Sequence, residues 1–258
     1  MKVWLGSLTM QGQRRRTGNR GAHMSITSSR ISEFGEVVRK LETHDSPENI
    51  RHAIFPDIVA LMEADFGATY RWNTRTGSSE EGGYHNMYAK ADEEHTRYFQ
   101  HHDPISRQMR AARRAIRVEE VIERKVLEGT EFWNAFLKQD GLHFGVNLFL
   151  FDGMEDIGDL RLWRARNHRP FDEVDLALLD GLAPHLKRAI LRQSERYAGL
   201  TPRERDIVHL VAKGCRDQDI GRILGISFST VRTHLNKAME KRGCANRAEL
   251  AASLRLLS

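Results

Sequence analysis

The apolar residues of segment 200–258 recur with the spacing of an α-helix. They form three groups along the chain. The first is Ile207, Leu210 and Val211, the second is Ile220, Ile223 and Leu224, and the third is Val231, Leu235, Ala238 and Met239. Spacings of three and four residues place each group on one side of a helix, with polar residues on the other side. The pattern predicts three successive amphipathic helices that bury their apolar sides against one another.

Capping residues stand where this pattern places the helix ends. Thr201-Pro202-Arg203-Glu204 has the form of a capping box, with a hydroxyl at the N-cap and a glutamate three residues later. Gly214 is placed to end this helix, and Asp217 is placed to cap the second. Gly225 suits a tight turn because glycine accepts a positive φ, and Ser227 is placed to cap the third helix. Two helices joined by such a turn are typical of a helix-turn-helix that reads the major groove of DNA.

The polar side of the third helix carries groups that a groove-reading helix needs. It holds Ser229, Thr230, Arg232, Thr233, Asn236, Lys237 and Lys241, with no acidic residue before Glu240. Arginine, asparagine and lysine side chains reach base edges, while hydroxyls and cations also hold phosphates. We predict DNA contacts from these residues together with Gln218 and Ser227. The alternative for such a helix is an ordinary surface helix with a solvated charged face.

A series of short motifs also runs in register through residues 200–256. The motifs are Leu200-Thr201, Arg203-Glu204, Ile220-Gly-Arg-Ile-Leu224, Ile226-Ser227, Thr230-Val-Arg232, His234-Leu235 and Asn246-Arg247-Ala-Glu249. This series resembles the LuxR/NarL-type helix-turn-helix of transcription regulators. The resemblance implies an all-α, four-helix domain whose third helix enters the major groove, with Thr230, Arg232 and Lys237 as the foremost DNA contacts. It also implies that the fourth helix, Asn246–Leu257, pairs two subunits.

Three positions depart from that family's pattern. Arg216-Asp217 stands where the family usually has Ser-Asn, and an aspartate caps a helix well but repels a nearby phosphate. Gly221 replaces the usual alanine inside the second helix, at a cost of about 1 kcal/mol. Lys241-Arg-Gly-Cys244 replaces Lys-Leu-Gly-Val, so that the stem of Arg242 must pack while its head reaches solvent. These departures predict modest affinity or an unusual site preference.

The front part of the chain, residues 25–199, shows mixed periodicity. Helical spacing occurs at 31–41, 47–64, 93–100, 104–114, 131–139 and 170–197, and β-prone runs occur at 66–72, 115–118, 144–151 and 158–163. The last two runs, joined by a glycine-containing turn, predict an antiparallel hairpin. Segment 74–83, rich in Thr, Gly, Ser and Glu, is predicted as a loop. The fold class is α+β, and its element order resembles the α/β/α GAF/PAS-like input domains often found ahead of LuxR-type readers.

Charge divides the chain in the same way. Residues 1–24 hold five basic residues and no acid, while residues 200–258 hold eleven basic and six acidic residues. Because the whole chain is +5, residues 25–199 carry a net charge of −5. We predict a disordered basic tail (1–24), a sensor domain (25–170), a connecting and dimer helix (171–199) and a DNA-binding domain (200–258). The DNA-binding domain, called the reader below, is basic, and the sensor domain is acidic. This division predicts that only one end of the chain binds DNA.

Candidate effector contacts lie in the middle of the sensor. Asp103-Pro104 followed by Gly145 resembles positions of acyl-homoserine-lactone receptors, in which the aspartate accepts the ligand's amide N–H. A pocket is predicted from Tyr84, Tyr88, Tyr98, Asp103 and Trp133. The family's downstream pocket tryptophan falls near Val118, so one aromatic wall is missing. In the alternative, Asp103-Pro104 caps the following helix and the tyrosines fill the core.

Composition and motifs argue against other classes. The chain has two cysteines, both in the reader, and no run approaches the roughly 18–20 apolar residues of a membrane span. We therefore expect a cytoplasmic protein without a membrane partner. The sequence lacks a nucleophile elbow, a P-loop, a dinucleotide-binding motif and metal-site spacing, so no enzymatic activity, cofactor or metal is expected.

These patterns together predict a dimeric regulator of transcription that binds double-stranded promoter DNA. Its N-terminal domain is expected to sense a small molecule or a partner. An acyl-homoserine-lactone receptor is the first alternative, and a lactone-processing enzyme fused to a DNA reader is the second.

Overall fold

The computed structural model describes residues 26–88 and 90–255. The predicted basic tail, residues 1–24, lies outside the described residues. The sensor elements are α1 (Ser28–Thr43), α2 (Ile50–Leu61), β1 (Phe66–Asn73), β2 (Ser78–His85), α3 (Ala91–Glu94), η1 (His95–Phe99), α4 (Gln100–His102), α5 (Ser106–Ala112), β3 (Ile116–Arg117), η2 (Val118–Glu120), α6 (Arg124–Glu128), η3 (Phe132–Leu137), β4 (Phe144–Asp152), β5 (Glu155–Arg164) and α7 (Glu173–Arg196). The reader elements are α8 (Pro202–Ala212), α9 (Asp217–Leu224), α10 (Phe228–Arg242) and α11 (Arg247–Arg255). The predicted α+β class with an all-α C-terminal unit is confirmed.

Within the described residues, the strands form one five-stranded antiparallel sheet in the order β2-β1-β5-β4-β3. β4 and β5 form the predicted hairpin, whose register pairs Leu148 with Leu160 and Asp152 with Glu155. β1 pairs with β5 on one side and with β2 on the other. The first strand of the domain therefore lies beside the last, in the middle of the sheet.

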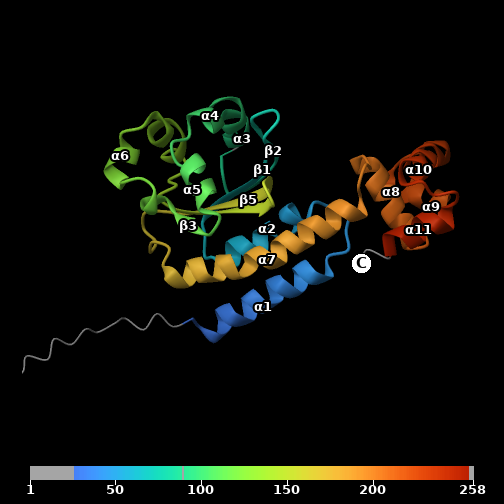
Figure 1. The fold of residues 1–258 in the computed structure, drawn as a ribbon, viewed down its shortest axis with the longest axis horizontal. Helices are drawn as coiled ribbons and strands as arrows, with labels where there is room; N and C mark the ends of the chain where they lie inside the picture. Colours follow the sequence, from blue (N-terminus) through green and yellow to red (C-terminus); the bar gives the residue numbers. More distant parts are fainter. Residues whose placement is uncertain (1–25, 89, 256–258) are drawn as a thin grey trace, which may run out of the picture.

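Helices cover both faces of this sheet (Figure 1). On one face α1, α2 and α7 bury Val146 and Leu148 of β4 and Leu160 of β5. On the other face the short helices and η3 bury Phe149 and Trp163. Successive residues of a strand point to opposite faces, so β4 and β5 contribute to the buried apolar residues on both faces of the sheet. The result is the predicted α/β/α layering.

The segment predicted as a loop, 74–83, is mostly a strand. After a short turn, β2 pairs with β1 along the edge of the sheet. Its glycines and glutamates are poor strand formers. Backbone hydrogen bonds to β1 hold it, together with ion pairs from Arg71 to Glu80 and Glu81 at 2.9 and 3.2 Å. The loop prediction was wrong because this strand depends on its neighbour and not on local propensity.

Two segments predicted as α-helices contain π-helices, η1 and η3. A π-helix is rare and often occurs at functional sites. The two π-helices touch through aromatic rings, with Phe99 of η1 at 5.0 Å from Phe136 of η3 between ring centroids. The apolar spacing of the sequence did not distinguish the π form from the α form.

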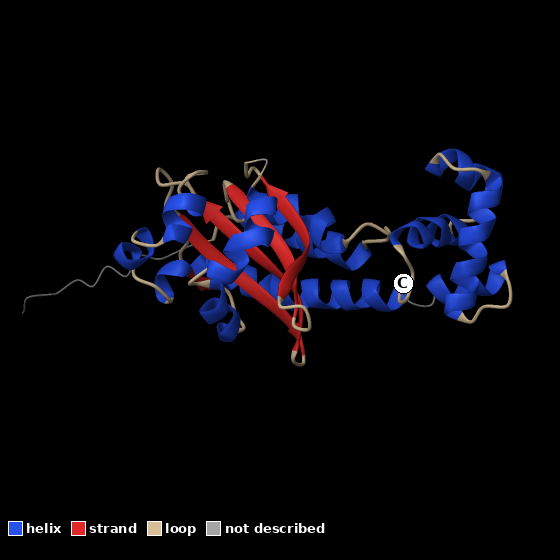
Figure 2. Cartoon of the chain, turned by 90° about the horizontal axis from the view of Figure 1, so that it is seen from above, coloured by secondary structure: helices blue, strands red, loops and turns tan. Residues whose placement is uncertain are grey.

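α7 leads directly from the sensor to the reader (Figures 1 and 2). Its Leu179, Leu182 and Leu186 are fully buried in the cluster shared with α1 and the sheet. Tyr197 and Leu200, just beyond the helix, belong instead to the buried cluster of the reader. A packing helix of the sensor is therefore continuous with the first anchoring residues of the reader.

Candidate nucleic-acid interface and sensor cavity

α10 begins at the predicted cap and buries the predicted side. The Ser227 hydroxyl accepts a hydrogen bond from the Thr230 amide at 3.1 Å. Gly225, with a φ of 65°, makes the turn that precedes the cap. Val231 and Leu235 are buried in the core that α10 forms with α8 and α9. Residues 217–242 therefore form a helix, a tight turn and a second, longer helix.

The opposite side of α10 faces solvent. The exposed predicted DNA contacts are Gln218 on α9, the cap residue Ser227, and Ser229, Arg232, Thr233, Asn236, Lys237 and Lys241 on α10. Thr230 is half-buried beside the cap, where its hydroxyl lies 2.8 Å from that of Ser227. A row of hydroxyl, amide and cationic groups on one helix is able to contact both base edges and phosphates.

Lys241, the last predicted contact, has a partner inside the protein. Its Nζ lies 2.7 Å from Oε2 of Glu204 on α8, and the Glu204 side chain is only 3% exposed. The same carboxylate oxygen accepts a hydrogen bond from the Thr201 amide at 2.9 Å. Burial alone would raise the pKa of Glu204, but the bonds from Lys241 and Thr201 hold it below its ordinary value. Lys241 thus ties α10 to the capping box of α8.

Asp217 is the first residue of α9 and not its N-cap. Arg216 occupies the cap position without a side-chain cap hydrogen bond. Oδ1 of Asp217 lies 2.5 Å from Nη1 of Arg247, and Oδ2 lies 3.6 Å from Nη1 of Arg232. The predicted capping role was wrong because a guanidinium is a stronger partner for a carboxylate than a neutral backbone amide is.

Gly221 has no room for a side chain. A Cβ there would lie 2.8 Å from the carbonyl oxygen of Ile226. The Ile226 amide in turn donates to the Gly221 carbonyl at 2.9 Å. The turn backbone therefore lies directly against α9 at this residue, and this close approach offsets the low helix propensity of glycine.

Two of the predicted effector contacts bind acidic side chains of the sensor. Tyr88 donates its hydroxyl hydrogen bond to Glu94. Burial and this carboxylate raise the pKa of Tyr88. The exposed Tyr98 donates to Glu131 at 3.0 Å. Neither tyrosine lines the buried cavity described below.

The other three predicted contacts lie at three different places. Tyr84, on the edge strand, packs edge-on against Tyr70 at 5.6 Å between ring centroids. Trp133 lines a separate surface cleft together with His143. Asp103 alone of the five predicted residues lines the buried cavity.

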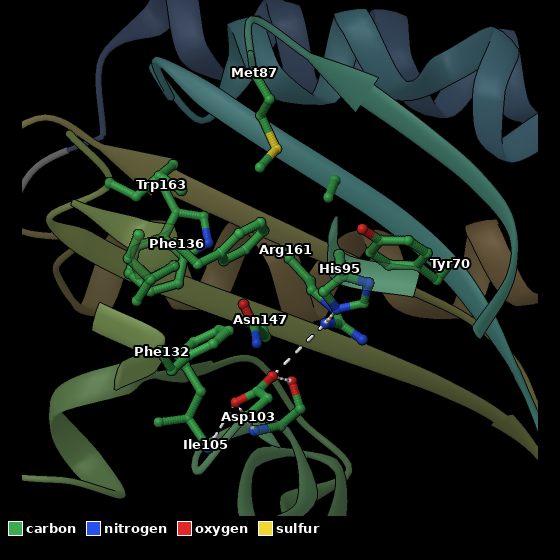
Figure 3. A pocket seen from close by; sticks show the side chains of 14 residues that line it. Tyr70, Met87, His95, Asp103, Ile105, Phe132, Phe136, Asn147, Arg161 and Trp163 are labelled. Carbon is green, nitrogen blue, oxygen red and sulfur yellow. Dashed lines mark hydrogen bonds and ion pairs between the residues drawn. The ribbon is translucent and has the colours of Figure 1, made fainter. Parts of the chain in front are cut away.

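This cavity lies between the sheet and the two π-helices (Figure 3). Phe132, Phe136 and Trp163 form its aromatic wall. The polar residues that line it are Tyr70, His95, Asp103, Ser106, Asn147 and Arg161. Its volume is about 30 Å³, so it has room for about one water molecule and not for an organic ligand. Apart from Asp103, sequence reasoning missed these residues, which come from distant segments and share no motif.

Two buried polar atoms of this cavity have no hydrogen-bond partner within the described residues, Nδ1 of His95 and Oδ1 of Asn147. Nη1 of Arg161 lies 3.2 Å from Nε2 of His95. A guanidinium only donates, so Nε2 accepts and Nδ1 carries the proton of the neutral ring. Burial, reinforced by the Arg161 charge, holds the pKa of His95 well below its ordinary value. The cavity therefore offers one unsatisfied donor and one unsatisfied acceptor.

The charge of Arg161 is already balanced. Its Nε and Nη2 lie 2.9 and 2.8 Å from Asp159, and its Nη1 lies 3.9 Å from Asp103. Asp103 also accepts hydrogen bonds from the amides of Ile105 and Ser106 at 2.8 and 3.1 Å, and so caps the start of α5. One buried cation thus faces two buried carboxylates, which disfavours an additional anion.

Two kinds of feature are absent from the described residues, 26–88 and 90–255. No helix there is long and apolar enough to cross a membrane. No group of three or more histidine, cysteine, aspartate or glutamate side chains there is arranged to hold a metal ion.

Comparison with known proteins matches the C-terminal part of the chain to a family. Residues 198–254 match the bacterial regulatory proteins of the luxR family. Over 59 residues, 23% of this chain, the sequence is 42% identical to a putative HTH-type transcriptional regulator of Mycobacterium bovis, and the chain spans about 7% of that relative's length. It is also 25% identical over 201 residues to the monoamine regulon transcriptional regulator of Klebsiella aerogenes, covering 76% of this chain and 84% of the relative.

Among solved structures, that of Escherichia coli SdiA is similar over 87% of this chain and 96% of that chain. The identity is 19% and the TM-score is 0.48, so this likeness assigns no ligand to the present protein. The helix-turn-helix geometry and the family match agree on the reader. Residues 198–254 therefore form a DNA-binding domain like that of the luxR family of bacterial regulatory proteins.

Proposed function

We propose that the chain is a DNA-binding transcriptional regulator whose N-terminal domain responds to a small molecule. The proposal rests on one observation, the exposed polar face of α10 above a buried apolar stripe. A helix of this kind, held at its N-terminus by a tight turn from a preceding helix, fits the major groove of B-DNA. The name of the Klebsiella relative, a transcriptional regulator matched over most of its length, supports the same function for the whole chain.

Substitutions on α10 test this function. Arg232→Ala and Lys237→Ala are expected to weaken binding to duplexes that the wild-type chain selects from a random library. The loss of a base contact costs about 1–3 kcal/mol of binding free energy. The loss of a phosphate contact reduces the salt slope, which is the slope of log affinity against log salt concentration, by about one. Arg222→Ala is the matched control, because Arg222 is exposed on α9 and pairs only with Asp219 among the described acidic residues. Wild-type binding in both α10 variants would refute the assignment of α10 as the reading helix.

For the effector, we propose an uncharged molecule with an apolar tail and a head group that both accepts and donates hydrogen bonds. His95 Nδ1 supplies the donor and Asn147 Oδ1 the acceptor. An anionic head is disfavoured because Asp103 and Asp159 already outnumber Arg161. Binding requires that the π-helices move apart, since the cavity is about 30 Å³. An acyl-homoserine lactone is one member of this class, and turnover of such a lactone by the purified chain would favour the enzyme alternative.

Three ligands with the same tail and different heads separate these possibilities. Hexanamide is expected to raise the thermal midpoint of the chain in a concentration-dependent way, while hexanoate and hexylamine are expected to raise it less. Asn147→Leu should abolish the response to hexanamide, because it removes the acceptor and fills the cavity. An equal response to hexanoate, or an unchanged response in Asn147→Leu, would contradict the proposed site.

We also propose that the regulator binds DNA as a homodimer, on the resemblance to the LuxR-type reader. Leu250 and Leu254 of α11 are fully buried in the core of their own chain. The dimer contact would therefore use the opposite side of α11, where Ala248 and Ala252 are exposed. Ala252→Arg is expected to shift the sedimentation equilibrium of the wild-type dimer toward monomer. A monomeric wild-type chain on DNA would contradict the proposal.

A further inference from the structure

The first residue of α9, Asp217, contacts cations from both helices that follow it. Oδ1 pairs with Arg247 at the start of α11, and Oδ2 lies 3.6 Å from the guanidinium of Arg232 on α10. Arg247 also donates to the Cys215 carbonyl, which fixes it beside α9. The Asp217 side chain is 11% exposed and that of Arg232 is 58% exposed. A largely buried, immobilised carboxylate thus touches one of the exposed cations of the candidate DNA-reading face.

The position of this carboxylate matters for DNA. Arg232, Asn236 and Asp217 line the same open cleft between α9, α10 and α11. A phosphate that approaches Arg232 from this side meets the negative charge of Asp217 a few ångströms away. Because Asp217 is screened from water by its surroundings, its effect on Arg232 is larger than that of a fully solvated acid.

We infer that Asp217 is a specificity-determining residue that acts by positioning Arg232. It offsets the attraction of Arg232 for any phosphate and holds the guanidinium near one place beside the reading face. Non-specific DNA binding is almost entirely electrostatic, whereas specific binding also has hydrogen bonds to base edges. Asp217 therefore weakens non-specific binding more than specific binding. The inference rests on the proposed DNA-binding function and adds to it a source of discrimination.

The test compares Asp217→Asn with Asp219→Asn. Both residues lie on α9 and both substitutions remove one negative charge, but Asp219 pairs with Arg222, at 3.3 Å, and not with Arg232. Binding is measured by fluorescence anisotropy, between about 50 and 200 mM salt, to a selected duplex and to a duplex of unrelated sequence. Asp217→Asn is expected to tighten binding to the unrelated duplex by about threefold to tenfold. Its salt slope should steepen by about one, and its ratio of specific to non-specific affinity should fall. Asp219→Asn should leave that ratio unchanged.

A double-mutant cycle shows whether Arg232 carries the effect. In an Arg232→Ala background, Asp217→Asn should no longer change the affinity ratio. Asparagine keeps an acceptor for Arg247, and a thermal melt of each variant checks the fold. If Asp217→Asn does not fold, the effect of the Asp217 carboxylate is measured by replacing its partner, Arg232, in a chain that keeps Asp217. Arg232→Ala should then reduce the salt slope clearly less than Lys237→Ala does, because the charge of Arg232 is already offset.

The outcomes separate this inference from the proposed function. Equal effects of Asp217→Asn and Asp219→Asn on the affinity ratio, or equal loss of salt slope in Arg232→Ala and Lys237→Ala, would overturn the role of Asp217. A wild-type chain that binds neither duplex would instead overturn the proposed function.

Discussion

Lys237 and Lys241 lie one turn apart on α10, but their replacement is expected to have different consequences. Lys237 is exposed and has no ion-pair partner among the described residues. Lys241 bonds to the buried carboxylate of Glu204 at 2.7 Å. We predict that Lys241→Met mainly lowers the stability of the reader, whereas Lys237→Met mainly weakens DNA binding.

The loss of stability expected for Lys241→Met depends on how deeply the Lys241–Glu204 pair is buried. A hydrogen bond to a charged group contributes about 1.5–3 kcal/mol, and removing one partner of a fully buried pair costs about 3–5 kcal/mol. Lys241 is 37% exposed, so water compensates part of the loss. We therefore expect a loss of about 1–3 kcal/mol in the free energy of unfolding of the reader. Lys237→Met should stay within about 0.5 kcal/mol of wild type.

The effect of pH has a definite sign. The pKa of Glu204 is lowered in the folded protein, so its contribution to stability is present above its ordinary pKa of 4.5 and is lost as pH falls through the lower folded value. Without Lys241 the pKa of the buried acid rises. The difference in stability between wild type and Lys241→Met is thus largest near neutral pH and shrinks below about pH 4.5.

Urea unfolding followed by circular dichroism at pH 7 and pH 4 measures this difference, and fluorescence anisotropy measures DNA affinity. Glu204→Gln in the Lys241→Met background should recover much of the lost stability, because it removes the unpaired charge. If Lys241→Met unfolds like wild type at pH 7 but loses DNA affinity as Lys237→Met does, Lys241 contacts DNA and does not stabilise the DNA-binding domain.

Three further predictions concern a glycine without room for a side chain, an exposed glycine and a buried acid. Gly221→Ala should destabilise the reader by about 1–3 kcal/mol in urea unfolding, because its Cβ would lie 2.8 Å from the Ile226 carbonyl. Gly35→Ala, on an exposed part of α1 with no atom within 4 Å of the new Cβ, should instead stabilise the sensor by about 0.5–1 kcal/mol. Burial, and then the charge of Asp159, raise the pKa of Asp156 to about 6. The contribution of Asp156 to stability is thus present below pH 4 and is lost as pH rises through 6, by about 2–3 kcal/mol. Asp156→Asn should flatten this part of the stability profile, and an unchanged profile would exclude Asp156 as its source.

Local chemistry made the reader predictable from its sequence. The phase of α10, the capping box at Thr201, the cap at Ser227 and the turn at Gly225 all depend on residues within a few positions of one another. Periodicity also predicted the β4–β5 hairpin, whose two strands are joined by a tight turn. Each of these features forms through backbone bonds and side-chain spacings that the neighbouring residues impose.

Long-range contacts decided the rest. The partner of Lys241 is 37 residues away, and that of Asp217 is 30 residues away. The edge strand β2 forms because it makes antiparallel backbone pairing with β1. The cavity takes His95 from a π-helix and Asn147 and Arg161 from two strands, so no spacing along the chain marks it. The sequence specifies the charge and size of each side chain. The group to which that side chain bonds depends on which distant segments pack beside it.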